Sequence, residues 1–192
     1  MNTESAKKRV VLAVTGASGL IYAGVLAREL GSREDVELHL ILSDAAREVM
    51  RHEDGLDEAT LRAVGRTIYS ERDIAAPPAS GSWRHQGMIV CPCSMASLAA
   101  IAQGLGSNLI HRAADVALKE GMKLVLVPRE MPLSTIHLRN MLAAREAGAV
   151  ILPACPGFYH RPATIQDLAA HVAGKILDQL DIPHGLFGRW GE

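Results

Sequence analysis

The sequence predicts a three-layer α/β fold in which helices cover both faces of a doubly wound, mostly parallel sheet. Strand-like and helix-like segments alternate along the whole chain, and the strand-like segments are largely apolar, as in LVLVP at 124–128. Parallel strands are buried on both faces, which is why they appear as apolar runs. The chain of 192 residues is 48% apolar, enough for one full core. We therefore expect a single domain over 1–192, with terminal tails at 1–8 and 186–192.

Five segments have the apolar character of buried strands. The first and fourth are continuous apolar runs, the second alternates before becoming fully apolar, and the third and fifth are short. We expect strands at 9–15, 36–43, 88–91, 123–128 and 149–152.

Six segments have the apolar spacing of helices, and the last is opened by Thr164 and Asp167 as a capping pair. The least regular part is 54–86, whose APPASGS core we expect to be a loop. The alternation of these strands and helices predicts a Rossmann-like or flavodoxin-like fold. We expect helices at 19–30, 44–52, 94–103, 110–120, 134–147 and 164–180.

Composition excludes several classes of partner. The net charge is −1, the isoelectric point is near 6.7 and aromatic residues make up 4%. We therefore expect neither nucleic acid nor a membrane surface as partner. The apolar segment 88–102 is too short to span a bilayer, and the N-terminal apolar run indicates a strand, not a signal peptide. Three cysteines without secretory features favour a reducing cytoplasm.

The turn TGASG at 15–19 lies between the first strand and the first helix. Its glycines allow a tight turn, and a helix start offers amides to a phosphate. The spacing is not G-x-G-x-x-G, so dinucleotide binding is not specified. The turn is either a phosphate or flavin loop or a purely structural connection.

Three serines follow strands of the predicted sheet. Ser18, Ser43 and Ser94 should lie at one edge, and Ser97 comes one turn after Ser94. Each could be a helix cap alone. Together they favour a site for the polar rim of a flavin or a phosphate.

Arg129 and Glu130 follow the buried strand 124–128 directly. Such charges are rarely buried unless paired, and the carboxyl ends of strands are where open α/β sheets bind ligands. An anion or a charged reacting centre is expected there.

Other candidates stay open on residue reasoning alone. Arg112 and Lys119 share one helix face, as a solvated stripe or a phosphate site. Tyr159 and His160 should reach the same sheet edge, and Lys175 is ordinarily a surface lysine. The C-x-C cysteines and the eight scattered histidines match no metal motif, so no metal is expected.

Several blocks, in order, resemble the UbiX flavin prenyltransferases over about residues 9–192. The segments PREMPLSTIHLRNM and RAADVALKE are the most specific to this family. The matching segments are TGASG, LILSDAA, PPASGS, CPCSM, NLIHRAADVALKE, LVLVPREMPLSTIHLRNM, GAVILPACPGFYHRP and RWGE.

The resemblance implies transfer of a dimethylallyl group from dimethylallyl phosphate to N5 and C6 of reduced FMN, without a metal. The product would serve a UbiD-type decarboxylase. The family also implies a homo-oligomer, typically a dodecamer, with sites at subunit interfaces.

Position by position, the resemblance assigns three groups of residues. Catalytic roles beside the flavin fall to Ser18, Glu53 and Glu130. FMN binding falls to Gly16, Ala17, Ser18, Ser43, Ser94, Met95, Ala96, Ser97 and Arg129. Donor binding falls to Arg112, Lys119, Arg129, Tyr159, Lys175 and Trp190. Two positions depart from many relatives: Lys175 replaces Arg and loses its fork geometry, and Ala96 replaces Lys.

The alternatives are an FMN-dependent cysteine decarboxylase-like lyase and an FMN-binding electron carrier. The first would carry a PxMNxxMW segment and a histidine after the first strand, where this chain has PREMPLSTIHL and Ser18. The second would show acidic bias and flanking aromatics. An NAD-dependent reductase is a further rival, but no tyrosine here is followed four residues on by lysine.

Overall fold

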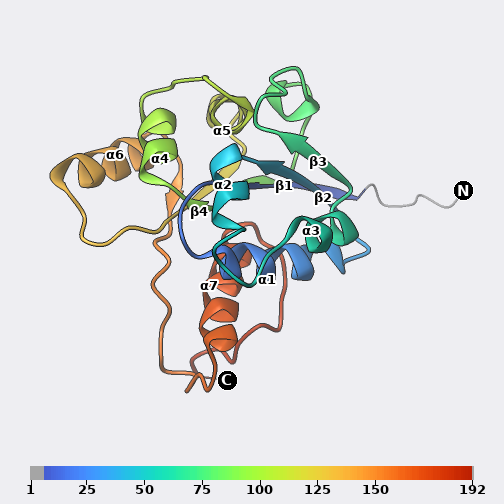
Figure 1. Ribbon diagram of the computed structural model, residues 1–192, viewed down its shortest axis with the longest axis vertical. Coiled ribbons are helices and arrows are strands. Elements are labelled where there is room, and N and C mark those ends of the chain that lie inside the picture. Colours follow the sequence, from blue (N-terminus) through green and yellow to red (C-terminus); the bar gives the residue numbers. More distant parts are fainter. Residues whose placement is uncertain (1–6, 192) are drawn as a thin grey trace, which may run out of the picture.

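A six-stranded, fully parallel sheet forms the middle layer of the computed structural model, which describes residues 7–191 (Figure 1). Its spatial order is β3-β2-β1-β4-β5-β6, so the winding reverses between β1 and β4. This is the order of the Rossmann fold, and it confirms the predicted doubly wound sheet. The strands are β1 (Lys8–Val14), β2 (Val36–Leu42), β3 (Thr67–Ser70), β4 (Gly87–Cys93), β5 (Lys123–Pro128) and β6 (Val150–Ile151).

Helices cover both faces of the sheet (Figure 1). One face carries α1 (Leu20–Gly31), α3 (Glu58–Val64) and α7 (Ile165–Gln179). The other carries α4 (Met95–Ala102) and α5 (Leu109–Lys119), and α6 (Thr135–Glu146) packs beside α4. The short α2 (Asp44–Val49) follows β2, and a single 3-10 turn spans Pro77–Ala79.

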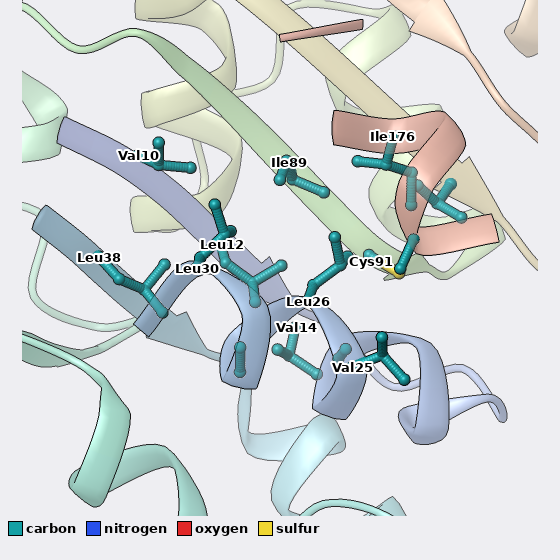
Figure 2. Close-up of a cluster of buried hydrophobic side chains, with 14 of the residues drawn as sticks. Val10, Leu12, Val14, Val25, Leu26, Leu30, Leu38, Ile89, Cys91 and Ile176 are labelled. Atoms are coloured by element: carbon teal, nitrogen blue, oxygen red, sulfur yellow. The ribbon is translucent and has the colours of Figure 1, made fainter. Parts of the chain in front are cut away.

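The two faces of β1 supply two separate cores. Val10, Leu12 and Val14 point to the α1 and α7 side, where Figure 2 shows them among other buried side chains. Val11 and Ala13 point to the α5 side. All five side chains are fully buried. Truncating a large residue in such a core costs about 2–5 kcal/mol, so each face contributes substantially to stability.

Every expected strand and helix is present with shifts of a few residues at its ends, and the capping box of Thr164 and Asp167 is confirmed. Besides the 3-10 turn at Pro77–Ala79, the irregular region 54–86 contains a helix and a strand that were not predicted, α3 and β3. β3 is a four-residue edge strand, and α3 buries only Leu61, so neither has a clear apolar period. Asp57, whose side chain caps α3, was the available sequence signal.

The termini differ slightly from the expected tails. β1 begins at Lys8, one residue inside the predicted tail 1–8, while residues 1–6 and 192 lie outside the described part. Residues of the 186–191 segment contact α7 through Phe187 and Arg189. Among the described residues, no helix is both long and apolar enough to cross a membrane.

Candidate active site at the carboxyl edge of the sheet

Thr15 joins β1 to β4 at the point where the winding of the sheet reverses. Its buried hydroxyl donates to the carbonyl oxygen of Pro92 at 2.8 Å and accepts the amide of Ser94 at 2.8 Å. Open α/β sheets bind ligands in this crevice, just outside the carboxyl ends of the strands. The hydroxyl therefore fixes the spacing of the two loops that flank the crevice.

The turn after β1 needs its glycines for two different reasons. A Cβ on Gly16 would overlap the Cβ of Ala45, because the start of α2 packs directly on this residue. Gly19 has a φ of 110°, in the left-handed region that glycine adopts without strain. Ala17 between them is buried, and Ser18 is exposed at the crevice.

Glu53 occupies the amino end of α1. Its Oε2 accepts the amides of Gly19 and Leu20 at 2.9 and 3.1 Å. Burial acts to raise the pKa of Glu53, but hydrogen bonds from Ser18 and these amides, with the nearby Arg129, outweigh it and hold the pKa below its usual value. The helix start that looked open to a phosphate thus already holds a carboxylate.

Ser43 and Ser94, two of the serines at this edge, are helix caps. Ser43 is buried, and its Oγ accepts the amide of Ala46 at 2.9 Å. Ser94 accepts the amide of Ser97 and donates to the Ser97 hydroxyl, both at 3.2 Å. Ser43 and Ser94 therefore lie at the carboxyl ends of β2 and β4, and Ser97 lies in the first turn of α4, as predicted.

The first turn of α4 follows Ser94 and includes Met95 and the exposed Ala96. First-turn amides of a helix have no partner within the helix. This end of α4 therefore faces the crevice with donors suited to an anion.

Arg129 ties the loop after β5 to the loop after β1. Its Nε donates to the carbonyl oxygen of Ser18 at 2.9 Å. Arg129 and the exposed Glu130 also line a pocket of about 430 Å³ whose other walls include Met131, Met141 and Cys155. The charged pair thus sits between the crevice and a mostly apolar pocket.

Tyr22, which sequence reasoning missed, lies one turn after Gly19. A Cβ on Gly19 would be 3.0 Å from its ring. Burial raises the pKa of Tyr22, the thiols of Cys91 and Cys155 add to this, and Arg129 opposes it. Its position fits ordinary helical spacing, so nothing in the sequence distinguished it from a core residue.

Tyr159, His171 and Trp190 form a second cluster between α7 and the C-terminal segment. Tyr159 bonds to His171 at 3.1 Å and meets the Trp190 ring edge-on, with centroids 5.7 Å apart. Lys175 lies one turn after His171 on α7 and pairs with Asp178 at 3.4 Å. The structure thus brings Tyr159 and Trp190 together, with Lys175 on the adjoining helix.

Asp178, also missed from the sequence, anchors this segment. Its carboxylate accepts from Arg189 at 2.8 Å and contacts His184 at 3.2 Å. Burial would raise the pKa of Asp178, but the bonds from Arg189 and Lys175 outweigh it and lower the pKa. Asp178 lies seven positions after His171 on α7. The sequence pattern alone gave Asp178 no distinct role.

Arg112 and Lys119 both lie on α5 and have ion-pair partners of their own. Arg112 pairs with Asp115 at 2.6 Å, and Lys119 pairs with the adjacent Glu120. The start of α5 lies at the carboxyl end of β3, because Leu109 donates to the Glu71 carbonyl oxygen at 2.7 Å. Lys119 ends that helix, roughly 15 Å further toward the amino edge of the sheet. One chain therefore does not bring Lys119 to Arg129.

Within residues 7–191, no group of three or more His, Cys, Asp or Glu side chains is placed to hold a metal ion. The two cysteines at the end of β4 are structural. Burial raises the pKa of Cys91 far above its usual value and that of Cys93 to about 12. Thiols in this state are unreactive.

The reversed strand order and the polar crevice at its switch point define a nucleotide-binding α/β protein of the Rossmann-like class. The family model described as Flavoprotein matches residues 1–181. Flavin prenyltransferase UbiX of Alkalihalophilus pseudofirmus is 46% identical over 200 residues, covering 99% of this chain and all of the relative. The chain belongs to the UbiX flavin prenyltransferases.

Two solved structures agree with this assignment. The dodecameric FMN-dependent UbiX-like decarboxylase from Escherichia coli O157:H7 superposes with a TM-score of 0.92 at 43% identity, covering 96% of this chain and 100% of that one. AnUbiX (PadA1), crystallised with FMN and dimethylallyl pyrophosphate, gives 0.90 at 45% identity, covering 97% and 98%. The cysteine decarboxylase TvaF, at 18% identity and a TM-score of 0.62, shares the fold alone.

Proposed function

We propose that this chain transfers a dimethylallyl group from dimethylallyl phosphate to N5 and C6 of reduced FMN. The observation that carries the proposal is the position of Arg129 and Glu130, between the crevice lined by Ser18 and an apolar pocket. A charged pair with one side toward a polar crevice and the other toward an apolar space suits a reaction that joins an apolar group to a polar ring.

The residues at the crevice fit FMN. The close packing at Gly16, the small residues after it and the amides opening α4 leave a polar, donor-rich edge. We assign FMN binding to the set expected from the sequence: Gly16, Ala17, Ser18, Ser43, Ser94, Met95, Ala96, Ser97 and Arg129. Reduced FMN, when bound, supplies the two nucleophilic ring positions.

Donor binding is assigned to the second cluster together with Arg129. The Tyr159 hydroxyl lies within an aromatic cluster beside Trp190, and the Lys175 ammonium, on the same helix as His171, is paired with Asp178. When the allylic C–O bond breaks, negative charge collects on the departing phosphate. Fixed cations and a phenol stabilise that charge electrostatically.

The carboxylates have separate tasks in this proposal. Glu53 holds the amino end of α1 and the Ser18 hydroxyl in place, which orients Ser18 toward the crevice. Glu130 is exposed at the pocket and positioned to relay the ring proton released during the second bond-forming step, with the freed phosphate as its acceptor.

In an oligomer, a neighbouring copy could supply the donor site with the cations that one chain does not bring there. α6 and the loop before it expose large apolar side chains at Met131, Ile136, Leu138 and Leu142. Such exposed apolar groups mark interaction surfaces. A similar protein is dodecameric. We propose the same assembly here, with Arg112 and Lys119 of a neighbouring copy reaching the donor site.

We further propose that residues 1–192 act as one domain in the cytoplasm, supplying prenylated FMN to a UbiD-type decarboxylase. Both hydrophobic cores share the single sheet, which supports one domain. All three cysteines are free thiols, which agrees with a reducing compartment.

The test is anaerobic incubation with reduced FMN and dimethylallyl phosphate, followed by mass spectrometry of the extracted flavin. Glu130→Gln and Lys175→Ala are run beside the wild type, and dimethylallyl pyrophosphate is tried as a second donor. We expect a flavin heavier by one prenyl unit, lost or greatly slowed in both variants. FMN bound but unchanged with either donor would overturn the assignment and favour the lyase or carrier alternatives.

A further inference from the structure

His171 lies at the centre of the second cluster and is not part of the residue set that the sequence identified. It is 6% exposed on α7. Its Nδ1 receives the backbone amide of Gly157 at 3.2 Å, and its Nε2 lies 3.1 Å from the Tyr159 hydroxyl oxygen. Both ring nitrogens are therefore used.

These two contacts determine where the imidazole proton resides. A backbone N–H can only donate, so Nδ1 must be the unprotonated acceptor. A neutral imidazole then carries its proton on Nε2, which donates to the oxygen of Tyr159. Because the Tyr159 oxygen accepts from His171, its own hydroxyl proton is left to be donated elsewhere.

Two neighbouring rings, one stacked and one tilted, hold His171 in this orientation. The His160 ring lies parallel to it, with centroids 4.9 Å apart and planes at 3°, and Phe187 packs at 4.7 Å. Phe187 comes this close to α7 because position 174 is glycine, where a Cβ would overlap both Phe187 and His184. The C-terminal segment and the loop after β6 thus enclose the imidazole from two sides.

We propose that His171 is a positioning residue for the prenyl donor: its Nε2–H fixes the Tyr159 hydroxyl so that the phenol O–H points to a phosphate oxygen. The proposal rests on the donor-binding role assigned to Tyr159 above. It identifies a residue that touches neither substrate and acts through Tyr159 alone.

The experiment measures kcat and the KM for dimethylallyl phosphate, with the affinity for reduced FMN determined in parallel. His171→Phe keeps a ring but removes the hydrogen bond, and we expect the donor KM to rise roughly five-fold, the loss typical of one hydrogen bond, with FMN affinity unchanged. His171→Gln places an amide N–H near the same point and should recover most of this loss.

Three further variants separate positioning from packing. Tyr159→Phe should raise the donor KM, and adding His171→Phe to it should cause no further rise. His160→Phe makes the same replacement at the stacked neighbour, whose ring nitrogens have no hydrogen-bond partner among the described residues, and should leave KM unchanged.

The outcomes are distinguishable. If Tyr159→Phe leaves the donor KM unchanged, the role assigned to Tyr159 fails, and the proposal with it. If Tyr159→Phe raises KM but His171→Phe does not, only the positioning role is overturned. An equal effect of His171→Phe with and without the Tyr159 hydroxyl would also overturn it, since the effect would then be structural.

Discussion

Arg129 reaches past β4 to hold Ser18: its Nε donates to the Ser18 carbonyl oxygen at 2.9 Å, joining loops 111 residues apart in sequence. β4 lies between the two parent strands in the sheet. The guanidinium therefore bridges the switch point and is held in a fixed direction by the backbone, not by another side chain.

Replacing Arg129 by Lys should slow prenyl transfer by roughly ten-fold or more. Lysine keeps the charge but lacks the planar fork that can bond Ser18 and an anion together, and a charge-assisted hydrogen bond contributes about 1.5–3 kcal/mol. Single-turnover rates under anaerobic conditions measure the effect. A lysine variant as fast as the wild type would show that only the charge matters.

Glu53→Ala should destabilise the fold by about 1 kcal/mol or more, because the amides of Gly19 and Leu20 lose their acceptor. Glu48→Ala is the matched control, since that carboxylate is exposed and bonds only neighbours on its own segment, Arg51 and His52. Urea unfolding compares the two. Equal stability losses would argue against a capping role.

The same carboxylate predicts a pH dependence. The pKa of Glu53 is lowered in the folded chain, so its stabilisation is fully present above its unfolded pKa near 4.5 and is lost as pH falls through the folded value. The stability difference between wild type and Glu53→Gln should therefore shrink below about pH 4.5.

Stability should already fall between pH 6.5 and 4, because of a buried histidine. Burial lowers the pKa of His85 from 6.5 to about 4. In this window His85 is protonated in the unfolded chain but not in the folded one, so acid favours unfolding. Over the whole window the free energy of unfolding falls by about 3 kcal/mol. His85→Leu should reduce the fall of the melting temperature over this range. A profile unchanged by the substitution would contradict the assignment.

Gly16→Ala should weaken FMN binding and cost about 1–3 kcal/mol of stability, because the new methyl overlaps Ala45. The double variant Gly16→Ala with Ala45→Gly removes the overlapping methyl and should recover much of both losses. Flavin titration and thermal melting provide the readouts. Failure of the double variant to recover would place the cause in the turn conformation instead.

The sequence was sufficient for the strands of the central sheet because their apolar runs have a single physical cause, burial on both faces. It also placed Ser18, Ser43, Ser94 and Arg129 at one edge, since carboxyl ends of parallel strands meet there. β3 was missed because a four-residue edge strand buries too little to leave a period.

The remaining site features depend on contacts between distant segments. Glu53 caps a helix that begins 33 residues before it, and His171 meets Tyr159 only because the loop after β6 folds back on α7. Neither of these contacts leaves a local pattern in the sequence. The resemblance named Glu53 without its structural task, and it did not name His171, Tyr22 or Asp178.

Because Trp190 contacts Tyr159 edge-on, the fluorescence of Trp190 can report where the C-terminal segment lies. The chain has two tryptophans, and the other, Trp83, lies beneath the Arg9 guanidinium, 5.2 Å from it, before the amino end of β4. Trp190 is 81% exposed beside the phenol. In a Trp83→Phe variant, tryptophan fluorescence would come from Trp190 alone. It would then report the packing of the C-terminal segment against Tyr159 without any added label.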